Sequence, residues 1–312
     1  MARLRLNEIV TRKIAMLGDV GAGWLENLDE IVNGYATAWG FTIGESLDGG
    51  SHAYVAEVVR HDGTPAVFKY ALPDMRGAGD HDKELRTVVA AQGNGYVHVF
   101  DYDLDNRAVL MERLGPTLDQ SGLSVAEQIE VMCRTLSPWA AAPDGLTIES
   151  GAEKAAWLHK NIEQMWNELD RPCSRAAVDQ AQLFATQRIA AHDPSKAVLV
   201  HGDAHQSNLL LAADGSYRMI DPDPMIAEPA ADLAVPMRDW NADLRASGDP
   251  AGAAVARCYR ISELTGVDPQ PIWEWGFMER MSTALYCDTL GIEDWPRDGY
   301  PVVEACVGVA TV

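Results

Sequence analysis

Three polar side chains in the middle of the chain have types and spacing that could hold a metal ion and handle a proton. Asp203 lies in a loop after the short apolar run Ala197–Val200, and Asn208 follows it by five positions. Asp221 comes thirteen residues after Asn208. An amide oxygen and a carboxylate are ligands that Mg²⁺ accepts from a protein, while water and phosphate fill its remaining positions. Asp203 would then be the remaining acid, placed to orient or deprotonate a hydroxyl group.

The segments between Asn208 and Asp221 are predicted to form a β-hairpin. Leu209–Ala212 and Tyr217–Ile220 flank an Asp-Gly dipeptide at positions 214 and 215, which is a strong signal for a two-residue turn. With these two residues as the loop, Asp221 lies opposite Asn208, and opposed side chains have Cβ atoms about 4.5–5.5 Å apart. The two ligands should therefore converge. A loop aspartate, an asparagine five residues later and an aspartate after a hairpin form the catalytic arrangement of protein kinases.

Two other interpretations of these residues stand beside this one. His201, Asp203 and His205 could form a metal cluster, although no HExxH motif or second group of His and Cys supports it. Asp203 and Asn208 could also simply shape a loop, as Asp and Asn often do. The combination of spacings with the hairpin favours phosphoryl transfer over both.

The same stretch resembles a known family. HGDAHQSN, followed by MIDPD and AADLA, resembles the aminoglycoside phosphotransferases, which are kinase-like enzymes. MIDPDPMIAEPAADLAVPMRDW, with WGFMERMST downstream, is most similar to the streptomycin 6-kinase/hydroxyurea phosphotransferase branch. The resemblance implies a two-lobe α+β fold, with a small antiparallel-sheet N-lobe over residues 1–114 and a larger, mainly helical C-lobe over residues 115–312. It also implies ATP or GTP as phosphoryl donor, Mg²⁺, and a small-molecule hydroxyl acceptor.

Apolar patterning upstream is consistent with such an N-lobe. Helices are predicted at Leu25–Trp39 and Asp80–Gln92. The predicted strands are Phe41–Leu47, Ala53–Arg60, Pro65–Tyr70, Tyr96–Tyr102 and Arg107–Arg113. Farther along, helices are predicted at Ser124–Leu136, Glu153–Leu169, Ala176–His192, Ala251–Leu264 and Pro271–Leu290.

Candidate nucleotide-binding residues lie on these N-lobe elements. The first two strands are joined by a glycine loop whose backbone N–H groups could approach a phosphate closely. Lys69, on the third strand, matches the kinase lysine that contacts the α- and β-phosphates. Glu84 on the following helix is its predicted ion-pair partner, with Asp82 as the rival. The loop residues concerned are Gly49, Gly50 and Ser51.

Three further roles are implied by the resemblance. The segment Met111–Leu114 would be the hinge, where backbone groups near Glu112 and Leu114 bind adenine. Asp232 would hold the catalytic loop rather than take part in the chemistry. Acidic residues on the C-terminal helices would line the acceptor pocket, and those singled out are Asp239, Glu274 and Glu279.

Composition narrows the choice of partners. The net charge of −21, from 46 acidic and 25 basic residues, lacks the basic footprint of a nucleic-acid-binding protein. No stretch approaches the roughly 20 apolar residues of a membrane span, and no signal peptide is predicted at the N-terminus. The five cysteines show no paired spacing, which favours reduced thiols in the cytoplasm. A monomer or a homodimer is equally compatible with these features.

The acceptor is predicted to be cationic, such as an aminoglycoside-type antibiotic, so that the enzyme would confer resistance. In Trp273–Arg280, aromatic and carboxylate side chains alternate, which suits ion pairing and cation–π contact. A metabolic kinase for a sugar or amino alcohol remains an alternative. A nucleotide-binding pseudokinase is another, although Lys69, Asp203 and Asp221 are all present.

Overall fold

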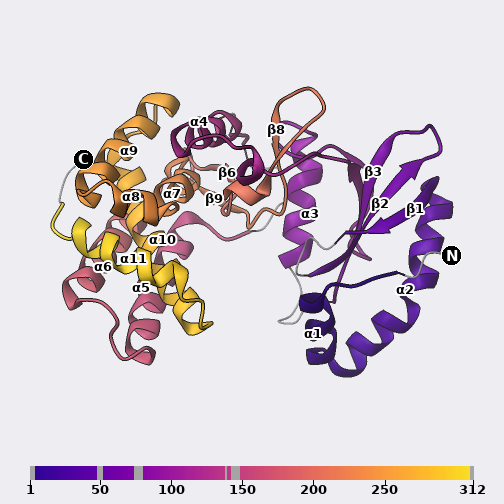
Figure 1. Ribbon diagram of the computed structural model, residues 1–312, viewed down its shortest axis with the longest axis horizontal. Coiled ribbons are helices and arrows are strands. Elements are labelled where there is room, and N and C mark those ends of the chain that lie inside the picture. Colours follow the sequence, from indigo (N-terminus) through magenta and orange to yellow (C-terminus); the bar gives the residue numbers. More distant parts are fainter. Residues whose placement is uncertain (1–3, 48–51, 74–79, 138, 142–147, 310–312) are drawn as a thin grey trace. The chain divides into compact units, whose positions relative to one another are not determined.

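The computed structural model describes residues 4–47, 52–73, 80–137, 139–141 and 148–309, and the chain divides into two compact units. Unit 1 comprises Met1–Pro116 and Leu210–Ile220, and unit 2 comprises Thr117–Leu209 and Asp221–Val312. Unit 1 contains a sheet with flanking helices, whereas unit 2 is mainly helical (Figure 1). This confirms the predicted α+β fold class.

Unit 1 is built on a five-stranded antiparallel sheet with the order β1-β2-β3-β5-β4. The prediction for β4 began too early, because Tyr96 instead forms an isolated bridge to Met219, and Val97 N donates to Met219 O at 3.0 Å. The other strands match their predicted segments to within one or two residues at each end. The strands are β1 (Phe41–Ser46), β2 (Ala53–Arg60), β3 (Pro65–Ala71), β4 (Val99–Asp103) and β5 (Ala108–Glu112).

Successive side chains of each strand point to opposite faces of this sheet, and the two faces have different surroundings. One face packs on α1 (Glu8–Met16) and α2 (Gly18–Ala38), which bury Trp24, Leu28 and Val32 against it. Because side chains two residues apart share a face, Ala56 and Phe68 lie on this core side, and Lys69 lies on the other. The helix α3 (Asp80–Ala91) covers that second side (Figure 1).

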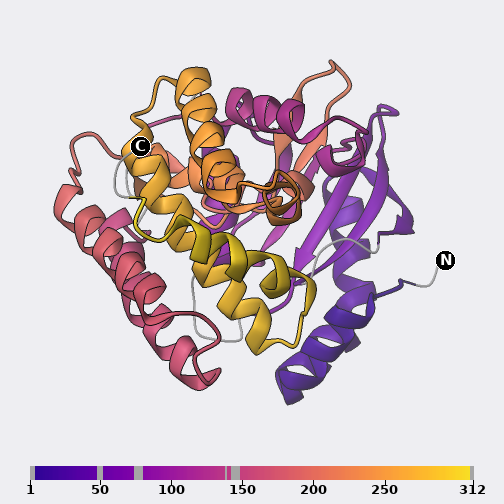
Figure 2. The same cartoon turned by 60° about the vertical axis from the view of Figure 1, so that its left-hand side comes forward.

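Unit 2 is a helical assembly centred on α10, which packs against α5, α6, α7, α9 and α11. Its gold and yellow C-terminal helices can be followed in Figure 2. Two helices begin with capping boxes, Ser124 with Glu127 and Ser150 with Glu153, which satisfy backbone N–H groups at their first turns. The helices are α4 (Val125–Leu136), α5 (Gly151–Glu168), α6 (Arg175–Ala191), α7 (Ala230–Arg238), α8 (Asn241–Ala246), α9 (Pro250–Thr265), α10 (Pro269–Thr289) and α11 (Asp294–Cys306).

The structure bears on two points raised by the sequence, membrane spans and the cysteine thiols. Among the described residues, no helix combines the length and apolarity that crossing a lipid bilayer requires. The five cysteines all carry free thiols. Burial raises the pKa of three of them, Cys133, Cys173 and Cys258, to about 12, so these three thiols stay protonated at neutral pH.

Candidate active site

The loop that carries Asp203 is positioned by a pair of strands, of which the sequence pattern predicted only the first. β6 (Val198–Val200) pairs antiparallel with β9 (Met225–Ala227), so that Val200 lies opposite Met225. The loop that follows β6 and the segment that precedes β9 therefore leave the pair at the same end. The three-residue β9 was not predicted, since it is too short to show a period.

Close backbone packing joins this loop to the segment after Asp221. Gly202 has a φ of +80°, which L side chains rarely adopt, and a Cβ added there would lie 1.8 Å from Asp223 O. Only glycine fits both conditions. The loop and the Asp221–Asp223 segment are thus held in direct contact within unit 2.

The backbone of the loop is anchored on Asp232, which lies in α7 and is 1% exposed. Its carboxylate accepts hydrogen bonds from His201 N at 3.0 Å, from Gly202 N at 2.8 Å and from Trp139 Nε1 at 3.0 Å. Burial raises the pKa of Asp232, and the three N–H donors oppose that rise because they favour the ionised form. These bonds are the ones expected of a residue that supports the loop.

The carboxylate of Asp203 is oriented by a residue that sequence reasoning missed. Arg238 Nη2 lies 3.1 Å from Asp203 Oδ1, and Arg238 Nε lies 3.0 Å from Asp239 Oδ1. On the other side, His205 Nε2 lies 3.7 Å from Asp203 Oδ2. Burial by itself raises the pKa of Asp203, but the charges of Arg238 and His205 outweigh it and hold the pKa below its ordinary value. Asp203 is therefore ionised at neutral pH.

Asn208 is fixed against the same loop. It ends the short helix η2 (Gln206–Asn208), and its Nδ2 donates to Asp203 O at 3.0 Å. This bond uses the amide nitrogen, so Oδ1 is the atom that could coordinate a cation. Both histidines of the alternative metal cluster instead accept backbone hydrogen bonds within the loop, His201 from Asp203 N and His205 from Ser207 N. Among the described residues, no group of three or more His, Cys, Asp or Glu is arranged to hold a metal ion.

The predicted two-residue turn of the hairpin is wrong. β7 (Leu209–Leu211) and β8 (Tyr217–Met219) pair, but Ala212 N donates to Ser216 O at 2.7 Å, so the loop has three residues. Gly215 has a φ of +83°, which is typical of a type I turn followed by a bulge. The Asp214 carboxylate stabilises this turn by accepting bonds from Ser216 N and Oγ at 2.9 and 2.6 Å.

The three-residue loop shifts the hairpin register by one residue. With Ala212 opposite Ser216, the register extended past the strands would put Asn208 opposite Ile220 rather than Asp221. Asp221 follows directly, is exposed, and has a φ of +52°, which bends the chain away from the strand direction. That Asn208 and Asp221 share one ion therefore remains a prediction that the hairpin pairing no longer supports by itself.

On the second face of the unit 1 sheet, Lys69 forms the predicted ion pair. Lys69 Nζ lies 2.5 Å from Glu84 Oε1 on α3, and the side chains are 13% and 21% exposed. Beside Lys69 on the same face lie Val55, Val67 and Met111, which are half-buried and apolar. An ammonium next to an apolar surface suits a phosphate and a flat base. The side chain of Asp82 and the loop residues Gly49, Gly50 and Ser51 lie outside the described residues.

The predicted hinge is tied to the hairpin. Glu112 Oε1 accepts from His98 N at 2.7 Å and lies 3.1 Å from Arg218 Nη1 on β8. Gly115 N donates to Leu211 O on β7 at 2.7 Å, and Leu114 is 5% exposed. These bonds fix the exit of β5, and Glu112 N is itself bonded to His98 O at 2.9 Å.

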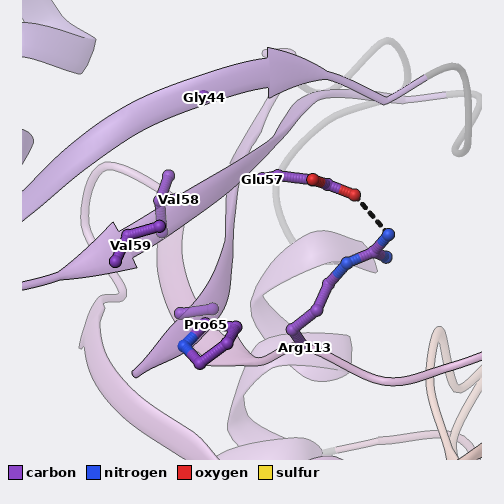
Figure 3. A pocket seen from close by; sticks show the side chains of 7 residues that line it. Gly44, Glu57, Val58, Val59, Pro65 and Arg113 are labelled. Carbon is purple, nitrogen blue, oxygen red and sulfur yellow. Dashed lines mark hydrogen bonds and ion pairs between the residues drawn. The ribbon is translucent and has the colours of Figure 1, made fainter. Parts of the chain in front are cut away.

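A small cavity of about 120 Å³ lies farther along the sheet, beside an ion pair between Glu57 and Arg113 (Figure 3). It is smaller than the roughly 300–1,000 Å³ of typical ligand pockets, so we do not assign it to the nucleotide. Its lining residues are Gly44, Glu57, Val58, Val59, Pro65, Ala66 and Arg113.

The three acidic residues predicted to meet the acceptor have different surroundings. Glu274 is 2% exposed and lies 2.5 Å from Arg188 Nε, which makes it a structural residue rather than a ligand for a substrate. Asp239 is 6% exposed and paired with Arg238. Glu279 is half-buried and interacts electrostatically with both Arg238 and Lys154.

Solved structures share this fold. A spectinomycin phosphotransferase in complex with ADP and spectinomycin superposes with a TM-score of 0.56 at 13% identity, covering 91% of this chain and 98% of that one. A choline kinase from Streptococcus pneumoniae gives a TM-score of 0.59 at 14% identity, covering 90% and 99%. The chain therefore has the fold of kinase-like small-molecule phosphotransferases.

The sequence identifies the family more narrowly. Residues 42–291 match the aminoglycoside/hydroxyurea antibiotic resistance kinases, and the chain belongs to this family. A streptomycin 6-kinase from Streptomyces glaucescens is 22% identical over 270 residues, 86% of each chain. A hydroxyurea phosphotransferase from Kitasatospora aureofaciens is 26% identical over 309 residues, 97% of this chain and 86% of that relative. The predicted family and enzyme class, a phosphotransferase with a hydroxyl acceptor, are confirmed.

Proposed function

We propose that this protein transfers the γ-phosphoryl group of ATP to a hydroxyl of a small polar molecule. The observation that carries the proposal is the fixed, ionised Asp203, whose carboxylate Arg238 orients and whose loop Asp232 anchors. A carboxylate placed in this way can accept a hydrogen bond from the acceptor hydroxyl and aim its oxygen at the phosphorus atom.

The other residues supply charge neutralisation and position. Lys69, held by Glu84, would bind the phosphates together with the glycine loop, and the hinge backbone would bind the base. Asn208 Oδ1 and the exposed Asp221 carboxylate are the oxygens that would hold Mg²⁺. When bound, Mg²⁺ would neutralise charge on the phosphate oxygens. GTP remains an alternative donor.

For the acceptor we propose a cationic molecule of the aminoglycoside type, so that the enzyme confers antibiotic resistance. Glu279 supports this because its carboxylate lies in the same charged cluster as Asp203. The relatives named as streptomycin 6-kinases fit the same class. The structural likeness to a choline kinase favours, as a second candidate, metabolic phosphorylation of an amino alcohol.

Transfer of labelled phosphate from ATP tests the proposal. Streptomycin, hydroxyurea, choline and neutral sugars should be screened, and at least one is expected to be phosphorylated. Asp203→Ala should then lower kcat by a factor on the order of 10²–10⁴ with little change in ATP affinity. Asp179→Ala, at a 59% exposed side chain on α6, is the matched control and should be active. Near-normal turnover by Asp203→Ala would reject its role, and ATP binding without transfer to any acceptor would favour a pseudokinase.

A further inference from the structure

Lys154 lies in the first turn of α5, and the start of this helix packs tightly on β9. Ile226 N donates to Glu149 O at 2.9 Å, and Ser150 forms a bridge with Ile226. A Cβ added to Gly151 would lie 2.9 Å from the Ala227 Cβ, so the helix start touches the strand directly. The start of α5 therefore packs against the strand that follows the Asp221–Asp223 segment.

The ammonium group of Lys154 lies within electrostatic range of several carboxylates. It interacts electrostatically with Glu279, Asp223, Glu149 and Asp203, in decreasing order of strength. In the part of the chain that the structure describes, no carboxylate oxygen lies within 4.0 Å of its Nζ. The Nζ lies instead 5.0 Å from the centre of the Trp157 ring. Lys154 is therefore a shared counter-ion for several acids rather than half of one ion pair.

The environment keeps this lysine charged. Burial lowers the pKa of Lys154, but the surrounding carboxylates outweigh it and hold the pKa above its ordinary value. A permanent positive charge thus lies among the same acids that a cationic acceptor would approach. A molecule whose hydroxyl bonds to Asp203 would lie within the electrostatic reach of this charge, since Asp203 itself interacts with Lys154.

We propose that Lys154 limits how strongly the acidic acceptor site favours cations, acting as a resident cation that weakens the binding of cationic acceptors relative to neutral ones. The inference rests on the proposed function, because it assumes that the acceptor lies beside Asp203. Coulomb repulsion between two cations within several ångströms is appreciable near a protein surface, and it acts only when the ligand is charged. Removing the resident cation would also leave Glu279 and Asp223 with one counter-charge fewer, so that they could attract a cationic ligand more strongly.

Acceptor kinetics with variants of α5 test this role. Lys154→Gln removes the charge, and Lys154→Arg keeps it. Lys160→Gln, at an exposed lysine of the same helix, is the matched control. For Lys154→Gln, the ratio of the KM for streptomycin to the KM for hydroxyurea should fall by about tenfold at low salt, because only streptomycin is cationic. The difference between the KM ratios of Lys154→Gln and the wild-type protein should shrink as ionic strength rises, because salt screens the charges. Lys154→Arg and Lys160→Gln should keep the wild-type ratio.

Direct binding separates this inference from the proposed function. The Kd of streptomycin, measured by calorimetry without ATP, should fall in Lys154→Gln by a similar factor, whether or not streptomycin is phosphorylated. Three results would overturn the role of Lys154. They are equal changes in KM for charged and neutral acceptors, an unchanged Kd for streptomycin, and the same fall in the KM ratio for Lys160→Gln. A lower kcat with an unchanged KM ratio would also overturn it. Absence of transfer by the wild-type protein to every acceptor would instead defeat the proposed function.

Discussion

Arg238 Nη2 lies 3.1 Å from Asp203 Oδ1, and the same guanidinium is held by Asp239 at 3.0 Å. Arg238 ends α7, and Asp232 lies in the first turn of this helix. One short helix therefore makes two bonds to the loop that carries Asp203. The first turn of the helix holds the loop backbone through Asp232, and its last turn holds the Asp203 carboxylate through Arg238.

The first prediction concerns pH dependence. The charge of Arg238 holds the pKa of Asp203 below its ordinary value, so wild-type Asp203 stays ionised as the pH falls toward that value. In Arg238→Gln, burial would no longer be offset by this charge and the pKa of Asp203 should rise. The acid limb of kcat/KM should then move to higher pH, with the largest loss of activity at the acidic end. Arg238→Lys should retain part of the wild-type profile, and an unshifted limb in Arg238→Gln would contradict the assignment.

The second prediction compares two glycines with positive φ. Gly202→Ala combines a disfavoured backbone with a Cβ 1.8 Å from Asp223 O, and should lower the free energy of unfolding by about 2–5 kcal/mol. Gly215 has a similar φ, but a Cβ there would meet nothing within 4 Å, so Gly215→Ala should cost only about 1–2 kcal/mol. Urea denaturation followed by circular dichroism measures both. Equal losses would show that the loop can move away from Asp223.

The third prediction concerns Mg²⁺. If Asp221 is a metal ligand, Mg²⁺ should no longer tighten ATP binding in Asp221→Ala, while the melting temperature should change little because the side chain is exposed. Asp214→Ala removes a carboxylate of the same hairpin that bonds Ser216 and Arg218, and should leave the Mg²⁺ effect intact. Titration calorimetry with and without Mg²⁺ distinguishes the two variants. A normal Mg²⁺ effect in Asp221→Ala would remove Asp221 from the site.

The fourth prediction concerns the Lys69–Glu84 pair. Lys69→Met should raise the KM for ATP by about tenfold or more, because a phosphate-binding charge is lost. Glu84→Gln should act in the same direction, and the double variant should be little worse than Lys69→Met, since Glu84 acts through Lys69. Lys196→Met, at an 83% exposed lysine, serves as control. Additive effects would mean that the two side chains act independently.

Local patterns predicted much of the fold. Alternating apolar residues located β2, β3 and β5, because a strand with one buried face shows a period of two. The match of Lys69 to the kinase lysine, followed by a helix with Glu84 and its rival Asp82, predicted an ion pair with Glu84, which the structure shows at 2.5 Å. The predicted register of the hairpin was wrong by one residue because Asp-Gly also suits a three-residue loop. A local motif does not distinguish a two-residue loop from a three-residue loop.

Residues that act over long sequence separations could not be predicted in this way. Arg238 follows Asp203 by 35 positions, and Lys154 precedes it by 49, so no spacing rule connects either one to the loop. Glu274 was predicted to meet the acceptor because carboxylates alternate with aromatic residues in Trp273–Arg280, whereas in the structure Arg188 on another helix neutralises it in the interior. Charge compensation of this kind depends on tertiary packing.

The anchoring of the loop on Asp232 has a consequence for its dynamics. The amides of His201 and Gly202 are bonded to a carboxylate that is 1% exposed, so they should exchange with deuterium only when α7 and the loop separate. This part of the chain therefore loses its conformational entropy during folding. The binding of nucleotide and acceptor therefore needs little further ordering of the loop. The loop is pre-organised rather than ordered by its substrates.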